Sequence, residues 1–291
     1  MILFVADQFS DVHRDPDHAY PGGAELTDAA VIEAAPDTVL TRTFSTLTND
    51  DIADASICIV GNAARASKAQ VASLATHPKL ILFEHDFRIC HHRGDMTTRN
   101  HWLHNQFEWC TCRNRRTLAL MRAARGVIFL TEYQRGFYTR NPWYRSRPYR
   151  VLGSSVFDNA TIDTWRERDP TLERRYEAAV SFSKHHAKGF AESLARAHAF
   201  TPEPLIIRNL PPSDVLTALQ ESKRFIHTPL SPEWAGRLPV EARFMGCEVI
   251  TNHRVGVTQE AWWKDPDVEA LNHVASAAVR FWRQVGELTG A

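Results

Sequence analysis

The stretch FIHTPLSPEWAGRLPVEARFMGCEVITNHRVG, residues 225–256, decides the fold that we expect for this chain. Apolar runs at 225–226 and 247–250 predict two buried strands, and residues 238–245 predict a helix that ends at Gly246. A strand, a loop, a helix and a strand in this order form a βαβ unit with parallel strands. Ligands bind such a unit where the loop enters the helix, because unpaired backbone N–H groups are exposed there.

Two carboxylates flank this turn, Glu233 in the loop and Glu241 on the helix, with seven residues between them. Such a pair is common by chance and can be two surface glutamates on an ordinary helix, so the residues around it matter. The frame consists of Glu233, Gly236, Glu241, Ala242, Gly246, Val249 and Ile250. On this frame the chain resembles the retaining nucleotide-sugar glycosyltransferases of the GT-B fold, of the family-4 (glycosyl transferases group 1) type. Glu248 departs from the pattern, since the family usually has proline there.

The whole chain alternates strand-like and helix-like segments, which predicts two α/β domains. A length of 291 residues fits two domains, and 44% hydrophobic and 23% charged residues are ordinary for a globular protein. The resemblance implies the GT-B arrangement, in which two Rossmann-like domains face a central cleft. We place an N-terminal, acceptor-side domain at residues 1–152 and a C-terminal, donor-side domain at 153–291. The last helix, at about 268–288, can pack back on the first domain.

Two features of the N-terminal half can face the cleft. Gly22 and Gly23 precede a helix, where backbone N–H groups can approach a phosphate, although a plain turn has the same sequence. His85 and Asp86 follow a strand at 79–83, where α/β folds place functional residues; the alternative for His85 is a hydrogen bond to a neighbouring loop. The resemblance implies that the two glycines close the cleft and help to hold the donor phosphates. It also implies that His85 contacts the donor sugar, with Asp86 on the acceptor side.

In the C-terminal half, a strand at 178–182 and a short loop lead to Lys188 and Gly189. The resemblance implies that Lys188 binds the donor diphosphate, whose leaving charge needs a cation. The alternative is a solvated lysine at the start of a helix. Ser183 stands where the family has arginine, so Lys184 is the candidate for a second cation.

The resemblance also implies the chemistry, which is transfer of a sugar from a UDP- or GDP-sugar to an acceptor hydroxyl with retained anomeric configuration. Glu241 is expected to hold the ribose hydroxyls. Glu233 and the turn formed by Gly236, Arg237 and Leu238 are expected to contact the donor sugar and diphosphate. We expect no cofactor and no metal ion, because lysine and helix N-termini supply positive charge to the leaving group.

Residues 87–150 contain thirteen arginines, no lysine and three acidic residues, with aromatic residues interleaved. Arginine and aromatic side chains suit phosphates, bases and sugar faces, so the region is a candidate acceptor site with Arg113, Arg115 and Arg116 as contacts. The acceptor is then a glycan, a lipid or a small molecule, or a modified base in DNA. The alternative is that these arginines pair with acidic residues elsewhere, since the formal net charge is zero.

A Cys-His-His run at 90–92 precedes a Cys-Thr-Cys run at 110–112. The Cys-x-Cys spacing is tighter than the two to four residues usual between zinc ligands, which favours buried free thiols over a metal site. Five cysteines form no repeated framework, which favours a reducing compartment. We see no signal-peptide pattern and no apolar run that could span a bilayer, so we expect a cytoplasmic protein.

A function of another class also fits the sequence, namely a non-catalytic sugar- or nucleic-acid-binding protein on a degenerate GT-B scaffold. The serine at 183 in place of the family arginine favours it. Hydrolysis of a nucleotide-sugar without acceptor separates the two, because a transferase usually shows some and a binder shows none.

Overall fold

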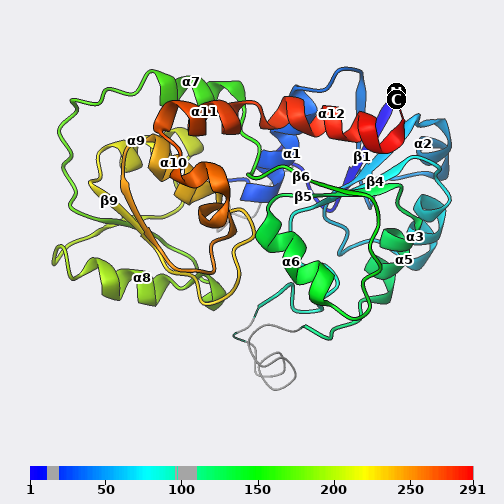
Figure 1. The fold of residues 1–291 in the computed structure, drawn as a ribbon, viewed down its shortest axis with the longest axis horizontal. Helices are drawn as coiled ribbons and strands as arrows, with labels where there is room; N and C mark the ends of the chain where they lie inside the picture. The colour runs from blue at the N-terminus through cyan, green and yellow to red at the C-terminus, as the bar shows by residue number, and fades with distance from the viewer. Residues whose placement is uncertain (12–19, 96, 98–109, 291) are drawn as a thin grey trace.

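The computed structural model describes residues 1–11, 20–95, 97 and 110–290 (Figure 1). The strands form two parallel sheets, one of six strands and one of four, which lie side by side with helices packed on them. This is the predicted α/β fold with two Rossmann-like halves. Within the described residues, no helix is both long enough and apolar enough to cross a bilayer.

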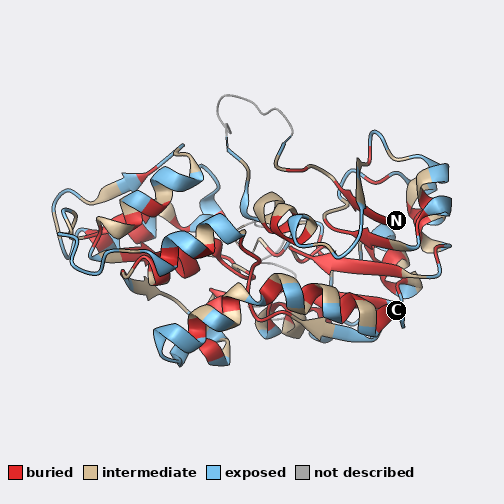
Figure 2. Cartoon of the chain, turned by 90° about the horizontal axis from the view of Figure 1, so that it is seen from above, coloured by how far each residue is buried: buried red, intermediate tan, exposed pale blue. Residues whose placement is uncertain are grey.

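The first sheet has the strand order β2-β1-β3-β4-β5-β6, and all neighbouring strands are parallel. Alternate residues of β1 enter different cores: Leu3 and Val5 pack on one face of the sheet, and Ile2 and Phe4 pack on the other. Both faces are therefore buried, which explains the continuous apolar runs in these strands (Figure 2). The strands are β1 (Ile2–Ala6), β2 (Val39–Thr43), β3 (Ile57–Val60), β4 (Leu80–Glu84), β5 (Gly126–Phe129) and β6 (Tyr149–Val151).

Helices cover the two faces of this sheet. Those from the first half of the chain are α1 (Gly23–Glu33), α2 (Asn49–Asp54), α3 (Lys68–Ala75), α5 (Arg115–Ala123) and α6 (Glu132–Arg140). The last helix, α12 (Ala277–Thr289), also packs on the first sheet beside α1, where Figure 1 draws it in red. The Phe281 ring lies 4.7 Å from the Phe83 ring, and Trp282 Nε1 donates to the Val31 carbonyl at 2.8 Å. The chain therefore returns to its first half after completing the second sheet.

The second sheet has the order β10-β9-β7-β8 and is also parallel. Its strands are β7 (Ala179–Ser181), β8 (Leu205–Ile207), β9 (Arg224–His227) and β10 (Glu248–Thr251). The helices of this half are α7 (Asn159–Arg166), α8 (Phe190–Ala197), α9 (Pro212–Gln220), α10 (Arg237–Phe244) and α11 (Asp267–Ala275), with three short 3-10 turns, η2 (His186–Lys188), η3 (Gly256–Gln259) and η4 (Ala261–Lys264). The predicted βαβ unit is β9, α10 and β10, and Phe225 pairs with Val249 in it.

Three elements differ from the sequence prediction. The charged segment at about residues 161–176 is expected to be one helix from its sequence, but the helix ends at Arg166, shortly before Pro170, a residue that cannot continue a helix. The last helix is two helices separated at Ser276, whose hydroxyl donates to the carbonyl of Asn272. Strand β2 was not predicted, because it is partly exposed at the edge of the sheet and lacks a strong apolar run.

Gly189 provides a stability prediction, because its φ is +64° and an added Cβ would lie 2.2 Å from the carbonyl oxygen of Thr228. Gly290 has nearly the same φ, +68°, with no heavy atom within 4 Å of an added Cβ. We expect Gly189→Ala to lower the free energy of unfolding by about 3 kcal/mol or more, since a steric clash adds to backbone strain. The control Gly290→Ala should cost about 1 kcal/mol or less. Urea unfolding measures both, and equal losses would contradict the packing around Gly189.

Candidate functional site

A cleft of about 340 Å³ lies between the two halves. It is bordered by residues that follow strands β4, β5, β7 and β9, so both sheets present their carboxyl ends to it. The first half contributes Gly23, Ala24, Thr27, His85, Asp86, His92, Arg93, Gly94, Asp95 and Leu130, and Ser155 lines the cleft from just after the boundary between the halves. The second half contributes His185, Ala187, Lys188 and all residues from Ser231 to Arg237.

The segment 231–237, which we call the cleft loop, is docked on the first half of the chain through Trp234. This side chain is 6% exposed and belongs to the core under the first sheet. Its ring lies 5.1 Å from that of Phe137 and 5.8 Å from that of Phe87, and its carbonyl accepts a hydrogen bond from Thr131 Oγ1 at 2.6 Å. The cleft loop therefore belongs to the second half by sequence and to the first half by packing.

Glu233 and Lys188 form an ion pair in the cleft, with Lys188 Nζ 2.6 Å from Glu233 Oε2. His227 Nε2 lies 3.7 Å from the same oxygen. Burial by itself raises the pKa of Glu233, but the charge of Lys188 and the nearby His227 side chain outweigh it and lower that pKa below its ordinary value. Glu233 is therefore ionised at neutral pH and can act only as a hydrogen-bond acceptor.

His85 forms a second polar pair on the opposite wall. Its Nε2 lies 2.6 Å from Asp28 Oδ1 on α1, and both side chains are 3% exposed or less. Burial raises the pKa of Asp28, and the contact with His85 opposes that shift. His85 Nδ1 is buried and has no hydrogen-bond partner among the described residues, although the histidine lines the cleft. A buried polar atom of this kind is a candidate contact for a ligand.

The backbone around His85 is fixed by a buried polar network. Glu84, which is fully buried, accepts hydrogen bonds from the Arg88 guanidinium and from the Tyr138 hydroxyl. The Tyr138 hydroxyl oxygen also lies 2.8 Å from the carbonyl oxygen of Asp86, so its single proton is shared between the two acceptors. Burial raises the pKa of Tyr138, so its hydroxyl keeps its proton and remains a donor. This network fixes the direction in which His85 and Asp86 leave β4.

Arg237 connects α10 to the first half of the chain. Its guanidinium lies 4.0 Å from the centre of the Phe157 ring and 3.4 Å from Glu241 Oε1, and it donates to Thr27 Oγ1 at 3.4 Å. A Cβ on Gly23 would lie 3.2 Å from the Arg237 side chain. Burial lowers the pKa of Arg237 and raises that of Glu241.

The predicted donor-site residues fall into two groups. Those that line the cleft are Gly23, His85, Lys188, Glu233, Gly236 and Arg237. Gly22, Lys184, Leu238 and Glu241 lie next to these residues in the sequence or in space but are not part of the cleft lining. Glu241 is buried against Arg237, so its carboxylate does not face the cleft.

The predicted acceptor residues lie in two different cavities. Asp86 lines the cleft and forms an ion pair with Arg93. Arg113, Arg115 and Arg116 line a second cavity of about 650 Å³, and Arg93 borders both cavities. The other side chains around the second cavity include Asp7, Lys68, Arg88, Cys90 and His91. Several residues of the arginine- and aromatic-rich region, namely Arg99, Trp102, Phe107, Glu108 and Trp109, lie outside the described residues.

Four residues near the cleft were not predicted from the sequence. Asp28 and Trp234 contact the site from the helix α1 and the cleft loop, and His227 lies beside Glu233. Asp95 accepts a hydrogen bond from Ser231 Oγ at 3.1 Å across the cleft. The one available signal was the position of His227 at the carboxyl end of a predicted strand.

No family model and no curated protein matches this chain. Among solved structures, it is similar to Anabaena Alr3699/HepE in complex with UDP, with a TM-score of 0.54, 15% identity, and coverage of 98% of this chain and 94% of that one. The complex of the same protein with UDP-glucose gives a TM-score of 0.54 at 14% identity and covers 98% of each chain. Its complex with UDP and glucose gives a TM-score of 0.50 at 15% identity, and the alignment covers 99% of this chain and 97% of that one. These similarities confirm the predicted GT-B fold over nearly the whole chain.

The Glu233 ion pair predicts a pH-dependent contribution to stability. Because the folded-state pKa of Glu233 is below its ordinary 4.5, its contribution is full above about pH 4.5 and is lost as the pH falls toward the folded-state value. We expect Glu233→Gln to lower the free energy of unfolding by roughly 1–3 kcal/mol at pH 7, since Lys188 and His227 lose their partner. The difference in the free energy of unfolding between the wild type and this variant, measured by urea unfolding, should become smaller at pH 4 and below.

The control for this experiment is Glu248→Gln, which removes a carboxylate that is 62% exposed and paired with Arg224 at 2.9 Å. An exposed pair contributes little, so we expect a change below about 1 kcal/mol at either pH. A Glu233→Gln deficit that stayed constant between pH 7 and pH 3 would show that the ionised form of Glu233 is not what stabilises the fold.

Proposed function

We propose that this protein is a retaining glycosyltransferase that moves a sugar from a nucleotide-diphosphate sugar, a UDP- or GDP-sugar, to an acceptor hydroxyl. The observation that carries the proposal is the cleft in which the Lys188–Glu233 pair of one half and His85 of the other line one cavity. The neighbour with the same fold was crystallised with UDP and with UDP-glucose, which supports this class of donor.

Lys188 is the proposed contact of the donor diphosphate. Its ammonium group has three N–H donors, and the single carboxylate oxygen of Glu233 uses one of them. The residue ends the turn η2, directly before the N-terminus of α8, whose exposed backbone N–H groups add positive potential. Negative charge develops on the diphosphate as the glycosidic bond breaks, so a fixed cation there stabilises the transition state. We propose that this arrangement needs neither a metal ion nor another cofactor.

The donor sugar is proposed to lie between Glu233 and His85. The ionised Glu233 can accept hydrogen bonds from sugar hydroxyls, and the turn at Gly236 provides backbone beside it. The unpartnered Nδ1 of His85 offers a contact from the other wall. Because the pKa of Glu233 is low, this residue orients the sugar and does not serve as a general acid.

Arg237 at the cleft wall and Glu241 behind it are proposed to support the donor site. The contacts of Arg237 with Thr27 and Phe157 position the start of α10, and Glu241 balances its charge. The ribose contact proposed for Glu241 requires its carboxylate to turn from Arg237 toward the cleft. Gly23 keeps the opposite wall free of a side chain near Arg237, which supports the proposed role of the Gly22–Gly23 pair in closing the cleft.

The acceptor is proposed to be anionic and to enter from the second cavity. Arg113, Arg115 and Arg116 converge there, and Arg93 links this cavity to the cleft beside Asp86. Arginine forks recognise phosphate groups, so an acceptor that carries phosphates, a nucleic acid or a phosphorylated glycan or lipid, fits the lining. None of the five cysteines, all of which lie in the described part of the chain, forms a disulfide, in keeping with the proposed cytoplasmic location.

Two lysines of one loop give a matched test of donor binding. Lys188 lines the cleft, whereas Lys184 is exposed and outside its lining. We expect Lys188→Ala to weaken binding of the diphosphate roughly 10- to 100-fold, because a hydrogen bond from a charged group is lost. Lys184→Ala should weaken it less than about threefold. Isothermal titration calorimetry with UDP and GDP measures this, after a thermal-shift screen of UDP, GDP, ADP and their sugars identifies the donor.

Turnover separates the enzyme from a non-catalytic binding protein on the same fold. The wild-type protein should slowly release sugar from the donor without acceptor, and Lys188→Ala should release much less at saturating donor. Proton NMR of the product formed with an acceptor should show the anomeric configuration of the donor. Donor binding without any sugar release would favour the binding protein, and an inverted product would exclude the retaining mechanism.

The second cavity gives a test of the acceptor class. We expect the triple variant Arg113→Ala, Arg115→Ala and Arg116→Ala to lose retention on DNA and to show a weaker salt dependence, because fewer phosphates are neutralised. The control removes three exposed arginines far from this cavity in the fold, Arg166, Arg175 and Arg283, with the same change in charge. Fluorescence anisotropy with labelled DNA at several salt concentrations measures both. Equal losses in the two variants would mean that overall charge, and not this cavity, binds the polyanion.

A further inference from the structure

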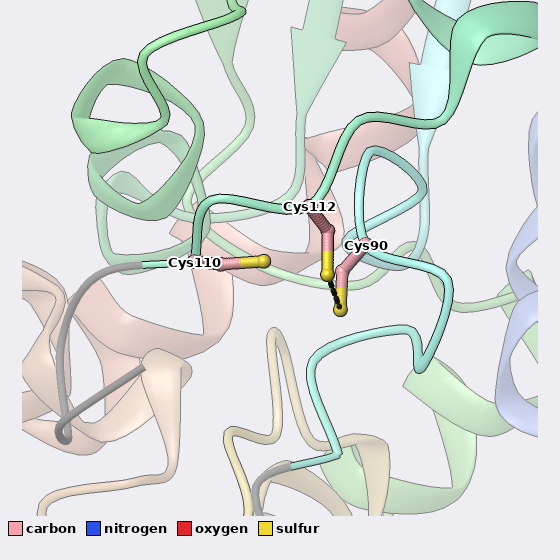
Figure 3. Close-up of side chains that lie close together, drawn as sticks. All are labelled: Cys90, Cys110 and Cys112. Carbon is pink, nitrogen blue, oxygen red and sulfur yellow. Dashed lines mark hydrogen bonds between the residues drawn. The ribbon is translucent and has the colours of Figure 1, made fainter. Parts of the chain in front are cut away.

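Three cysteines converge beside the second cavity, outside the proposed donor site. Cys90 lies in the turns that follow β4, and Cys110 and Cys112 lie in the extended segment before α5 (Figure 3). The three Sγ atoms are all within 4.8 Å of one another, and those of Cys90 and Cys112 are 3.7 Å apart. The sequence spacing favoured separate buried thiols, because it does not show that Cys90 meets the Cys-x-Cys run.

The separation of the sulfurs matches the geometry of a thiolate metal site. Zinc binds cysteine sulfur at about 2.3 Å, so two sulfurs on a tetrahedral ion lie about 3.8 Å apart. The distance of 3.7 Å between Cys90 Sγ and Cys112 Sγ agrees with that value. Cys110 needs a shift of about 1 Å or less to join them at the same spacing. Figure 3 shows the Cys90 and Cys112 sulfurs next to each other, with the Cys110 side chain extending toward them from the side.

Hydrogen bonds from other elements hold the backbone of this cluster in place. Asn141, which is 2% exposed, donates from Nδ2 to the carbonyls of Cys110 at 2.7 Å and Cys112 at 3.1 Å. Trp143 Nε1 donates to the Thr111 carbonyl between them at 3.0 Å. The backbone of residues 110–112 is therefore held by contacts that need no metal ion, which lowers the ordering cost of binding one.

We propose that Cys90, Cys110 and Cys112 bind a structural zinc ion. Each thiol gives its proton to solvent as its sulfur bonds to the ion, and no electron is transferred. Three thiolates on a divalent cation carry one net negative charge. Cys90 borders the second cavity together with Arg88, Arg113 and other basic residues, so the surroundings suit that charge and offer the ion a path of entry. The described residues supply three of the four ligands that a structural zinc takes, and the fourth position is open to water or another group.

The proposed zinc site would link two segments of the chain, one of which continues into the lining of the cleft and the other into the lining of the second cavity. The turn that holds Cys90 continues to Arg93, Gly94 and Asp95, which line the cleft. The segment that holds Cys112 continues to Arg113 and into α5, which border the second cavity. A shared ion thus fixes the distance between the cleft and the arginines without contacting the donor.

Metal analysis of the purified protein tests this proposal. The protein is expressed with added zinc and purified without a chelator or a histidine tag. Plasma mass spectrometry should find one zinc per chain in the wild type and almost none in Cys90→Ser or Cys112→Ser. The matched control is Cys247→Ser, since Cys247 is a buried cysteine outside the cluster whose thiol donates to the Leu219 carbonyl, as a hydroxyl can. This variant should keep its zinc.

Cobalt spectroscopy of the unaltered chain provides a second test if the serine variants fail to fold. Cobalt(II) added to the metal-free protein should give thiolate-to-cobalt charge-transfer absorption that saturates at one equivalent and disappears on adding zinc. A chelator should lower the melting temperature of the wild type and of Cys247→Ser. Wild-type protein without zinc, with five titratable thiols or with a Cys90–Cys112 disulfide, would overturn the proposal, as would full zinc content in Cys112→Ser. None of these readouts depends on the proposed transferase activity.

Discussion

The insertion of Trp234 into the core of the first half is the contact on which the site depends. Successive residues of the cleft loop point in different directions: Glu233 pairs with Lys188 in the cleft, and Trp234 packs among Phe87, Phe137 and Tyr133. The loop is held from behind by Gly256, whose backbone N–H donates to the Glu233 carbonyl at 2.7 Å. A Cβ on Gly256 would lie 2.1 Å from the Trp234 carbonyl oxygen, so only glycine allows this approach. The acidic residue of the site is thus positioned by an apolar anchor one residue away.

The charged pairs around the cleft differ in how far they are removed from water, and this separates their roles. The pairs Glu84–Arg88 and Arg237–Glu241 have side chains that are 11% exposed or less, and breaking either would leave a buried charge without a partner. They hold backbone segments in place. Lys188 is 48% exposed in its pair with Glu233, so a diphosphate can reach the ammonium group without first unfolding anything. The same distinction explains why Arg237, although it lines the cleft, fits a positioning role better than direct phosphate binding.

The sequence predicted the elements that form local patterns and missed the contacts that join distant ones. The βαβ unit at 225–256 and the strands before His85 and Lys188 have strong apolar runs with clear ends, so their positions and the nearness of Lys188 to Glu233 were predictable. The Asp28–His85 pair was not predictable from the sequence. It depends on how α1 packs beside the end of β4, and the two residues are 57 positions apart in the chain. The three-cysteine cluster depends in the same way on two segments that meet only after the chain has turned back. Strand periodicity carries no information on either contact.

Exposure also indicates which contacts near the acceptor can change when a ligand binds. The Asp86–Arg93 pair has side chains that are 24% and 57% exposed, and a pair of that kind contributes at most about 1 kcal/mol. An acceptor phosphate could therefore replace Asp86 on Arg93 at little cost, which would leave the Asp86 carboxylate at the cleft as a hydrogen-bond acceptor for an incoming hydroxyl. Ser231 and Asp95 join the two walls at the same place, at 3.1 Å. This partly exposed ion pair thus stands where the two proposed substrates would meet, while the buried pairs keep the walls fixed around it.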